Sequence, residues 1–346
     1  MSTESKHAHR KDEHLAIATH LFDENQVNAF DQVRLLHQSL PEIAVADIHL
    51  ETELFGKSIA APIYINAMTG GSKKTGQING QLAQIAAELQ IPMAVGSESI
   101  VIKEPASSST FEVVRKFNPN GVVFANMSAD KDLQQIQAAI DLLAADALQI
   151  HLNVIQEAVM PEGERTFYWA DNLSQYQDRL DLPIIVKEVG FGMNNATLYQ
   201  LQQLGIQYID VSGTGGTNFA KIENVRRPGH DMAYLAGLGN TTVESLLEAR
   251  QVQGPTYFAS GGIRNPYDIV KAWRLGAQMV GMSGTILHLL LHSGLTQTIT
   301  TLKDWLVQLK LLLAIFGARD ILALRQTPMV LTPDLISYCQ QRQIQL

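Results

Sequence analysis

Four polar side chains stand within seven residues that follow an apolar run near the middle of the chain. The run covers residues 147–150, and the polar groups belong to His151, Asn153, Gln156 and Glu157. A buried polar group must find a partner or cost free energy, so a packed strand end has no structural use for so many. They indicate a ligand with several hydrogen-bonding groups, and a carboxylate beside amides favours a hard cation such as Mg²⁺. A solvated turn before the next helix is the alternative interpretation.

Size and composition narrow the class of protein. The chain has 346 residues, of which 46% are hydrophobic, which is enough for one large core. Its net charge of -8 and the lack of a basic block argue against a nucleic-acid partner. Cys339 is the one cysteine, which excludes disulfides within the chain and fits a reducing cytoplasm. Residues 1–13 are too polar for a signal peptide, and apolar stretches such as 309–316 are too short to span a bilayer, so we expect a cytoplasmic protein without a membrane partner.

Eight apolar, β-rich runs recur along the chain, and nearly all end in Gly, Ser, Asn or another polar residue. The runs are 62–67, 92–95, 121–125, 148–150, 183–186, 208–211, 256–259 and 279–282. Segments with helical spacing lie between them, such as 78–89, 133–143, 196–204 and 266–275. This alternation predicts an α/β fold, a (β/α)8 TIM barrel. A doubly wound open sheet is the alternative, but the Gly-rich turn after the first run lacks the spacing that such sheets carry.

An N-terminal extension precedes the barrel. We expect residues 1–55 to form this extension and residues 56–346 to form the barrel. A helix is predicted at 28–38, ended by Pro41. The polar stretch 10–14 lies in a tail that should be mobile unless a ligand or a neighbouring subunit orders it.

The barrel prediction brings distant residues together, because active sites of this fold lie where the strands end. The side chains and turns expected to surround one cup are Thr69, Ser97, Asn126, His151, Asn153, Lys187, Ser212, Gly261 and Ser283.

Two Gly-rich turns, 260–264 and 281–284, follow the seventh and eighth predicted strands. Turns at these positions form the common phosphate site of the fold, with backbone N–H groups directed at the anion, and Arg264 could add a charged contact. Glycines that serve only a positive φ are the alternative. A third Gly-rich loop, 212–217, could cover the rest of a bound nucleotide.

Lys187 ends the fifth predicted strand. A lysine in a barrel mouth is desolvated unless it faces an anion, either a neighbouring carboxylate or a ligand. A flavin ring that becomes anionic on reduction is a suitable partner, and Thr69 and Asn126 could hydrogen-bond its edge. The residues therefore predict a phosphate-bearing cofactor, FMN.

With these motifs in place, the chain closely resembles the type 2 isopentenyl-diphosphate delta-isomerases, which are FMN-dependent. The matching stretches are Arg10-Lys11-Asp12-Glu13-His14, Met68-Thr69-Gly70-Gly71, Gly96-Ser97, His151-Leu152-Asn153-x-x-Gln156-Glu157, Lys187-Glu188-x-Gly190-x-Gly192, 210–217 and 260–264. They run in order from about residue 10 to 284. The Gly-rich pieces occur in many FMN barrels, whereas the tail motif combined with His-x-Asn-x-x-Gln-Glu is specific.

The resemblance implies conversion of isopentenyl diphosphate to dimethylallyl diphosphate, with reduced FMN as acid/base and cation stabiliser, NADPH as its reductant and Mg²⁺ on the diphosphate. It implies catalytic roles for His151, Gln156 and Glu157, with Glu157 holding the metal. Substrate contacts would come from Arg10, Lys11, His151, Asn153 and Gln156, once the tail closes over the site. FMN would be bound by Ala67, Met68, Thr69, Ser97, Asn126, Lys187, Ser212, Thr217, Gly261, Gly262, Arg264, Ser283 and Gly284. A homotetramer or homo-octamer is implied as well.

The chain departs from the family pattern at two places. Glu98-Ser99 stands where the family usually has Gln-Arg, which would place a carboxylate near the diphosphate unless it points away. Asn218-Phe219 stands where Ser-Trp is usual.

Other flavin barrels are the competing interpretations. A 2-hydroxy-acid oxidase or a dihydroorotate-type dehydrogenase is one, but the turn after residue 259 lacks the histidine that the oxidases use. An inosine-monophosphate-dehydrogenase-like barrel needs a loop cysteine, whereas Cys339 lies beyond the last predicted strand. A non-catalytic flavin-binding protein would not require Gln156 and Glu157.

Overall fold

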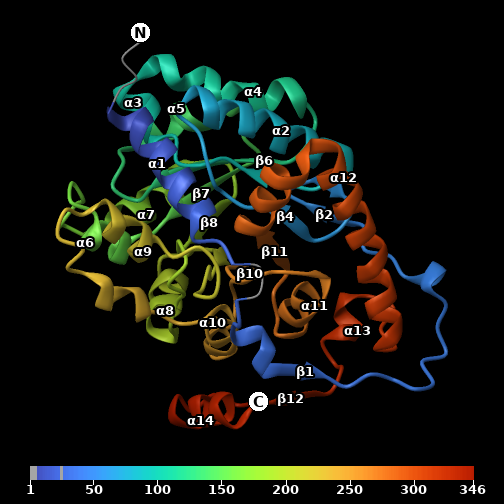
Figure 1. Cartoon of the computed structure of the whole chain (residues 1–346). Helices are drawn as coiled ribbons and strands as arrows, with labels where there is room; N and C mark the ends of the chain where they lie inside the picture. Colours follow the sequence, from blue (N-terminus) through green and yellow to red (C-terminus); the bar gives the residue numbers. More distant parts are fainter. Residues whose placement is uncertain (1–5, 24–25) are drawn as a thin grey trace.

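A closed barrel of eight parallel strands forms the centre of the molecule (Figure 1). The computed structural model describes residues 6–23 and 26–346. The strands, in their order around the barrel, are β10 (Thr256–Ser260), β11 (Met279–Met282), β4 (Ile63–Ile65), β5 (Met93–Ala94), β6 (Val123–Ser128), β7 (Ala147–His151), β8 (Ile184–Lys187) and β9 (Tyr208–Asp210). Each falls on one of the eight runs that the sequence predicted, so the TIM-barrel prediction is confirmed.

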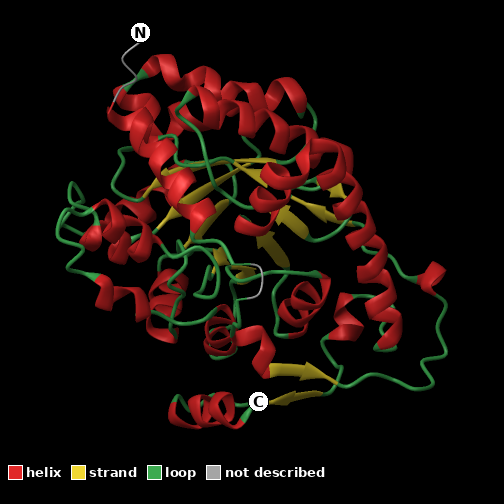
Figure 2. Cartoon of the chain, viewed as in Figure 1, coloured by secondary structure: helices red, strands yellow, loops and turns green. Residues whose placement is uncertain are grey.

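Helices surround the strands, as Figure 2 shows. The helices between strands are α2 (Lys73–Leu89), α3 (Ser99–Lys103), α4 (Ser109–Phe117), α5 (Leu133–Leu143), α6 (Val154–Val159), α7 (Ala170–Arg179), α8 (Asn195–Gln203), α9 (Phe219–Arg226), α10 (Thr242–Ala249) and α11 (Pro266–Arg274). Local capping fixes several starts: the side chains of Ser72, Asp132 and Thr241 accept backbone N–H groups in capping boxes.

The barrel interior is packed below the strand ends. Tyr64, Phe124 and Phe258 fill it, and all three are fully buried. The hairpin of β2 (Thr52–Leu54) and β3 (Lys57–Ile59) contributes Leu54 and Ile59 to the same cluster. Because apolar side chains close this end, ligand chemistry is confined to the opposite, C-terminal end of the strands.

The first helix of the N-terminal extension lies across that opposite end. Helix α1 (Lys6–His20) contacts α2, α9 and the C-terminal helix α12 (Gly284–Ile315), and Lys11 Nζ lies 3.4 Å from the carbonyl oxygen of Ser97. Helix α12 bends at Gly294, whose φ of 75° is not helical. The mobility of the tail remains a prediction.

The helix predicted at 28–38 is wrong. Residues Ala29–Gln32 form one 3₁₀ turn, capped by Asn28, and Val33–Leu35 form strand β1. Strand β1 pairs antiparallel with β12 (Met329–Leu331) some 300 residues away. Val33 and Leu35 are buried while Arg34 is exposed, a two-residue alternation that fits a strand. Pairing with β12 makes this segment a strand, and β12 is too far along the chain for the spacing of neighbouring residues to indicate it.

The C-terminal part packs beside the barrel. It comprises the short helix α13 (Ile321–Leu324), β12 and helix α14 (Pro333–Gln341). In the N-terminal extension, a 3₁₀ turn at Val45–Asp47 contacts α12. No helix within residues 6–23 and 26–346 is long and apolar enough to cross a membrane.

Candidate active site

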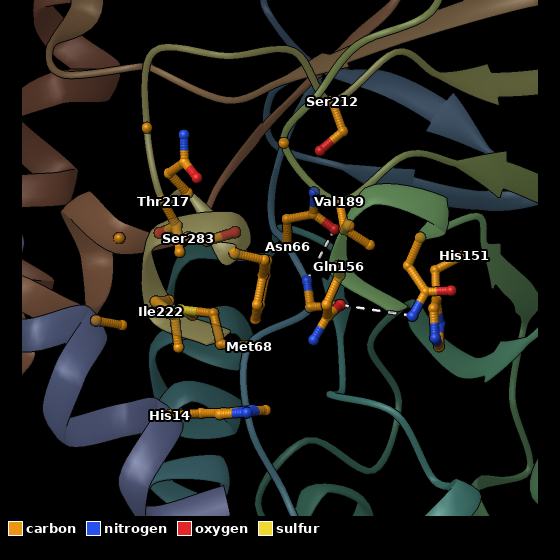
Figure 3. A pocket seen from close by; sticks show the side chains of 18 of the residues that line it. His14, Asn66, Met68, His151, Gln156, Val189, Ser212, Thr217, Ile222 and Ser283 are labelled. Atoms are coloured by element: carbon orange, nitrogen blue, oxygen red, sulfur yellow. Dashed lines mark hydrogen bonds between the residues drawn. The ribbon is translucent and has the colours of Figure 1, made fainter. Parts of the chain in front are cut away.

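A cavity of about 720 Å³ opens at the C-terminal ends of the barrel strands, within the range of cofactor and ligand sites. Figure 3 shows that His151 and Gln156 face the same space as His14 of α1. All the residues predicted for the site line this cavity: Arg10, Lys11, Ala67, Met68, Thr69, Ser97, Asn126, His151, Asn153, Gln156, Glu157, Lys187, Ser212, Thr217, Gly261, Gly262, Arg264, Ser283 and Gly284. The fold therefore brings them together, while their roles remain predictions.

Helix α6 carries Gln156 and Glu157. It begins one residue after Asn153, whose side-chain NH₂ donates to Glu157 Oε1 at 2.8 Å. The backbone N–H of Glu164 donates to Glu157 Oε2 at 2.7 Å. These bonds hold the carboxylate in place beside the cavity. In the described part of the chain no group of three or more His, Cys, Asp or Glu side chains could enclose a metal. A cation at Glu157 would therefore need ligand oxygens or water, as Mg²⁺ commonly does.

Glu223 of helix α9 is fully buried and lies next to Gln156. Its Oε1 accepts a hydrogen bond from Gln156 Nε2 at 3.0 Å and lies 3.1 Å from His14 Nε2, and its Oε2 accepts from Arg226. Burial raises the pKa of Glu223, but the neighbouring His14 and the hydrogen bonds from Gln156 and Arg226 outweigh this effect and lower the pKa to about 2. Gln156 is thus oriented by an anion.

Basic groups stand on the tail side of the cavity. Burial, together with the neighbouring Arg10, lowers the pKa of Lys11 to about 8, against the opposing effect of Glu223. Arg10 Nη1 lies 3.5 Å from Glu162. Burial, with the charges of Lys187 and Lys11, lowers the pKa of His151 to about 3. Several half-buried cationic or proton-accepting groups around one cavity favour an anionic ligand.

Lys187 lies at the floor of the cavity. Its ammonium donates to the carbonyl oxygen of Glu188 at 2.6 Å, whereas the Glu188 carboxylate accepts the N–H groups of Val189 and Phe191. The Glu188 carboxylate thus accepts backbone N–H groups and is not hydrogen-bonded to Lys187. Burial lowers the pKa of Lys187, although Asp210 and Glu188 act in the opposite direction. A buried ammonium facing a cavity fits an anionic ring such as a flavin.

The Gly-rich loops make a tight wall. A Cβ on Gly261 would lie 2.1 Å from the carbonyl oxygen of Gly213, and Gly261 has a φ of +94°. Gly262, with a φ of +76°, would place a Cβ 3.0 Å from Gly215. These glycines are required by the close approach of two backbone segments, and the same approach brings backbone N–H groups to the cavity wall. This geometry fits a phosphate.

Arg264 is engaged elsewhere. Its guanidinium pairs with Asp31 at 2.7 Å and with the buried Asp268 at 2.9 Å. Its hydrogen bonds to these two carboxylates raise the pKa of Arg264 further. Its charge is balanced by these carboxylates, so it holds the N-terminal segment, and its contact with a phosphate remains a prediction.

The two departures from the family pattern have structural explanations. Glu98 does not line the cavity; it is buried, its Oε2 accepts the N–H of Asn126 at 2.9 Å, and burial raises its pKa well above the usual range. Asn218 caps helix α9 and donates to the carbonyl oxygen of Ala236. Phe219 packs edge-on against His14 at 6.1 Å between ring centroids.

Several polar residues of the site were missed from the sequence: Asn66, Gln149, Asp210 and Glu223. The first three lie within or at the end of barrel strands, where polar residues in apolar runs were the available signal. Glu223 sits in a polar helix, where nothing local marks it as buried.

The fold and the cavity define an FMN-type barrel enzyme. A family model described as FMN-dependent dehydrogenase matches residues 16–140 and 103–331. Closer relatives are named isopentenyl-diphosphate delta-isomerase. The protein from Latilactobacillus sakei is 49% identical over 344 residues, that from Lacticaseibacillus paracasei 48% over 340 and that from Staphylococcus epidermidis 45% over 346, covering 98–99% of each chain. The chain belongs to the family of isopentenyl-diphosphate delta-isomerases, FMN-dependent type.

Solved structures support the fold. A mandelate oxidase variant with a monooxide FMN adduct superposes with a TM-score of 0.63 at 16% identity, covering 92% of each chain. A flavocytochrome b2 variant with pyruvate bound gives 0.68 at 17% identity, covering 92% of this chain and 82% of its own. At such identities the likeness concerns the barrel alone.

Proposed function

We propose that this enzyme converts isopentenyl diphosphate to dimethylallyl diphosphate without net redox change. The proposal rests chiefly on one observation, namely that Gln156, held by Glu223, and Glu157 face the same cavity as a buried lysine suited to a flavin. The names of relatives at 45–49% identity support the substrate. The reaction adds a proton at C4 and removes one from C2, so atoms balance within one molecule.

The residues expected to hold FMN are those of the cavity floor and the Gly-rich wall. Lys187 would face the electron-rich edge of the ring, Thr69 and Asn126 would hydrogen-bond it, and the turns at Gly261 and Ser283 would receive the phosphate. Reduced FMN, when bound, supplies a proton and the electron density that stabilises positive charge at the tertiary carbon. NADPH is the proposed reductant.

The diphosphate would bind at the tail side. Arg10 and Lys11 supply positive charge there, and His151 and Asn153 supply hydrogen-bonding groups. Glu157 would hold Mg²⁺ together with diphosphate oxygens, because a single carboxylate with substrate phosphates is a common magnesium environment. Helix α1 would then contribute two contacts to the diphosphate.

Gln156 would lie beside the reacting carbons. A neutral amide is a weak base, so we assign it the orientation of the substrate or the relay of a proton rather than its removal. Its hydrogen bond to the Glu223 carboxylate polarises the amide and fixes which atom, oxygen or nitrogen, faces the cavity.

The test is anaerobic incubation of the full chain with isopentenyl diphosphate, FMN, Mg²⁺ and a catalytic amount of NADPH. We expect many molecules of dimethylallyl diphosphate per NADPH oxidised. Absence of this product would refute the isomerase, and oxidation of NADPH or of a hydroxy acid in step with turnover would indicate a redox flavoenzyme. Light scattering on the same preparation tests the proposed homotetramer or homo-octamer.

A further inference from the structure

Three buried side-chain amides form a row at the wall of the cavity, which two of them line. Asn66 follows β4, Asn126 lies in β6 and Gln149 lies in β7, and each is 3% exposed or less. Side-chain amides at this depth must be hydrogen-bonded at both ends or cost free energy. The row connects Asp210 at one end with His151 at the other.

The direction of the row is fixed at the Asp210 end. Asn66 Oδ1 accepts the backbone N–H of Ala67 at 2.8 Å, so this atom must be the oxygen. Asn66 Nδ2 therefore points to Asp210 Oδ2, at 3.0 Å. Asp210 also accepts hydrogen bonds from Tyr64, Ser212 and Ser260. Its oxygens act as acceptors throughout.

The donor and acceptor atoms of Asn66 in turn fix those of Gln149 and Asn126. Gln149 Nε2 donates to Asn66 Oδ1 at 3.2 Å, which leaves Gln149 Oε1 to accept from Asn126 Nδ2 at 3.4 Å. Asn126 Oδ1 then lies 2.8 Å from His151 Nδ1. An amide oxygen is only an acceptor, so His151 must supply the proton at this contact.

We infer that this row of amides sets the tautomer of His151, with the proton on Nδ1 and Nε2 left for the ligand. Gln149, which does not line the cavity, is thereby a positioning residue, and Asn66 acts on His151 through it. The opposite tautomer would reverse Asn126 and Gln149, and two oxygens would then meet at Asn66 or at Asp210. Because one buried contact would become repulsive, the Nδ1–H form should dominate at least tenfold.

The arrangement has a consequence for proton transfer. In both the neutral and the cationic ring the Nδ1–H bond to Asn126 is kept, so His151 gains or loses a proton only at Nε2. A diphosphate oxygen accepts hydrogen bonds, so a His151 that contacts it must carry a proton on Nε2. His151 can then take up or release that proton without rearrangement of the buried amides. This consequence rests on the proposed isomerase; the tautomer itself does not.

The experiment uses the FMN-loaded full chain, labelled with ¹⁵N-histidine and free of substrate. Ring ¹⁵N shifts distinguish the tautomers, and the signal of His151 is the one lost in His151→Gln. We expect a protonated Nδ1 and an unprotonated Nε2. In Gln149→Met, which cannot bridge Asn66 and Asn126, we expect mixed tautomers.

Thr298→Val is the matched control, because it removes the side-chain hydrogen bond of a fully buried residue, to the carbonyl oxygen of Gly294, and neither residue lines the cavity. It should leave the His151 signals unchanged. A wild-type ring protonated on Nε2 instead, or an unchanged tautomer in Gln149→Met, would overturn the inference. The wild-type spectrum decides even if Gln149→Met fails to fold. Since it needs no turnover, it is independent of whether the isomerase assay succeeds.

Discussion

The side-chain amide of Gln156 donates a hydrogen bond of 3.0 Å to Glu223, a carboxylate 67 residues further along the chain. The two residues come from helices α6 and α9, which contact each other beside the cavity. Glu223 is fully buried and also forms an ion pair with Arg226, so its own position is strongly constrained. Gln156 is therefore held in one orientation before any ligand binds, which is the condition for an amide to act on a reacting carbon.

Glu223→Gln tests this relationship. The amide keeps the size of the side chain but removes the negative charge that orients Gln156. We expect kcat to fall about 10- to 100-fold, because a hydrogen bond to a charged group contributes about 1.5–3 kcal/mol. Glu13→Gln is the control, since Glu13 also contacts Arg226, at 3.3 Å, and is not a partner of Gln156. Equal losses of kcat in both variants would contradict the assigned role.

Loss of the proton from Lys11 should weaken substrate binding at alkaline pH. Its pKa of about 8 in the free enzyme means that the ammonium is present below pH 8 and lost above it. An uncharged Lys11 attracts a diphosphate less, so kcat/KM should decline above about pH 8. In Lys11→Met this decline should disappear, with kcat/KM low throughout. A wild-type profile that stays flat to pH 10 would refute the contact.

Glu157 should determine the magnesium requirement. In Glu157→Gln we expect the Mg²⁺ concentration for half-maximal activity to rise at least tenfold, because an amide is a poorer ligand for a hard cation. Glu164→Gln is the matched control: Glu164 also lines the cavity, but only its backbone N–H contacts Glu157. Identical magnesium titrations for wild type and Glu157→Gln would exclude the metal role.

Lys187→Met should weaken FMN binding at least tenfold, as measured by flavin fluorescence. The chain offers a matched control in Lys271, another buried lysine, whose ammonium donates to the carbonyl oxygen of Phe30 outside the cavity. Lys271→Met should lower stability and leave FMN affinity unchanged. Retention of wild-type FMN affinity by Lys187→Met would show that the ammonium serves only the protein core.

Arg264→Gln separates a structural role from a cofactor-binding role. The substitution leaves the buried Asp268 without its cation, which should cost about 3 kcal/mol of unfolding free energy, measured by denaturant titration. FMN affinity should change less than threefold, because the guanidinium is already committed to two carboxylates. A large loss of FMN affinity with normal stability would instead support the phosphate contact that the sequence predicts for Arg264.

The periodic features of this protein could be predicted from the sequence. Eight apolar runs alternating with helical segments were sufficient for the barrel, because strand and helix periods are written in neighbouring residues. Polar residues at run ends were sufficient to place Lys187, His151 and Glu157 around one cavity, since parallel strands end on one side of a barrel.

Only the tertiary structure decided which polar groups meet. The strand at Val33–Leu35 depends on a partner near the C-terminus, so local spacing predicted a helix there. Arg264 finds Asp31 in the N-terminal extension, and Gln156 finds Glu223 on another helix. Side-chain hydrogen bonds and ion pairs act over about 3 Å in space and carry no signature in sequence distance. The sequence by itself thus determined the barrel and the residues around its mouth, whereas their partners, and with them their charges and orientations, were decided by packing.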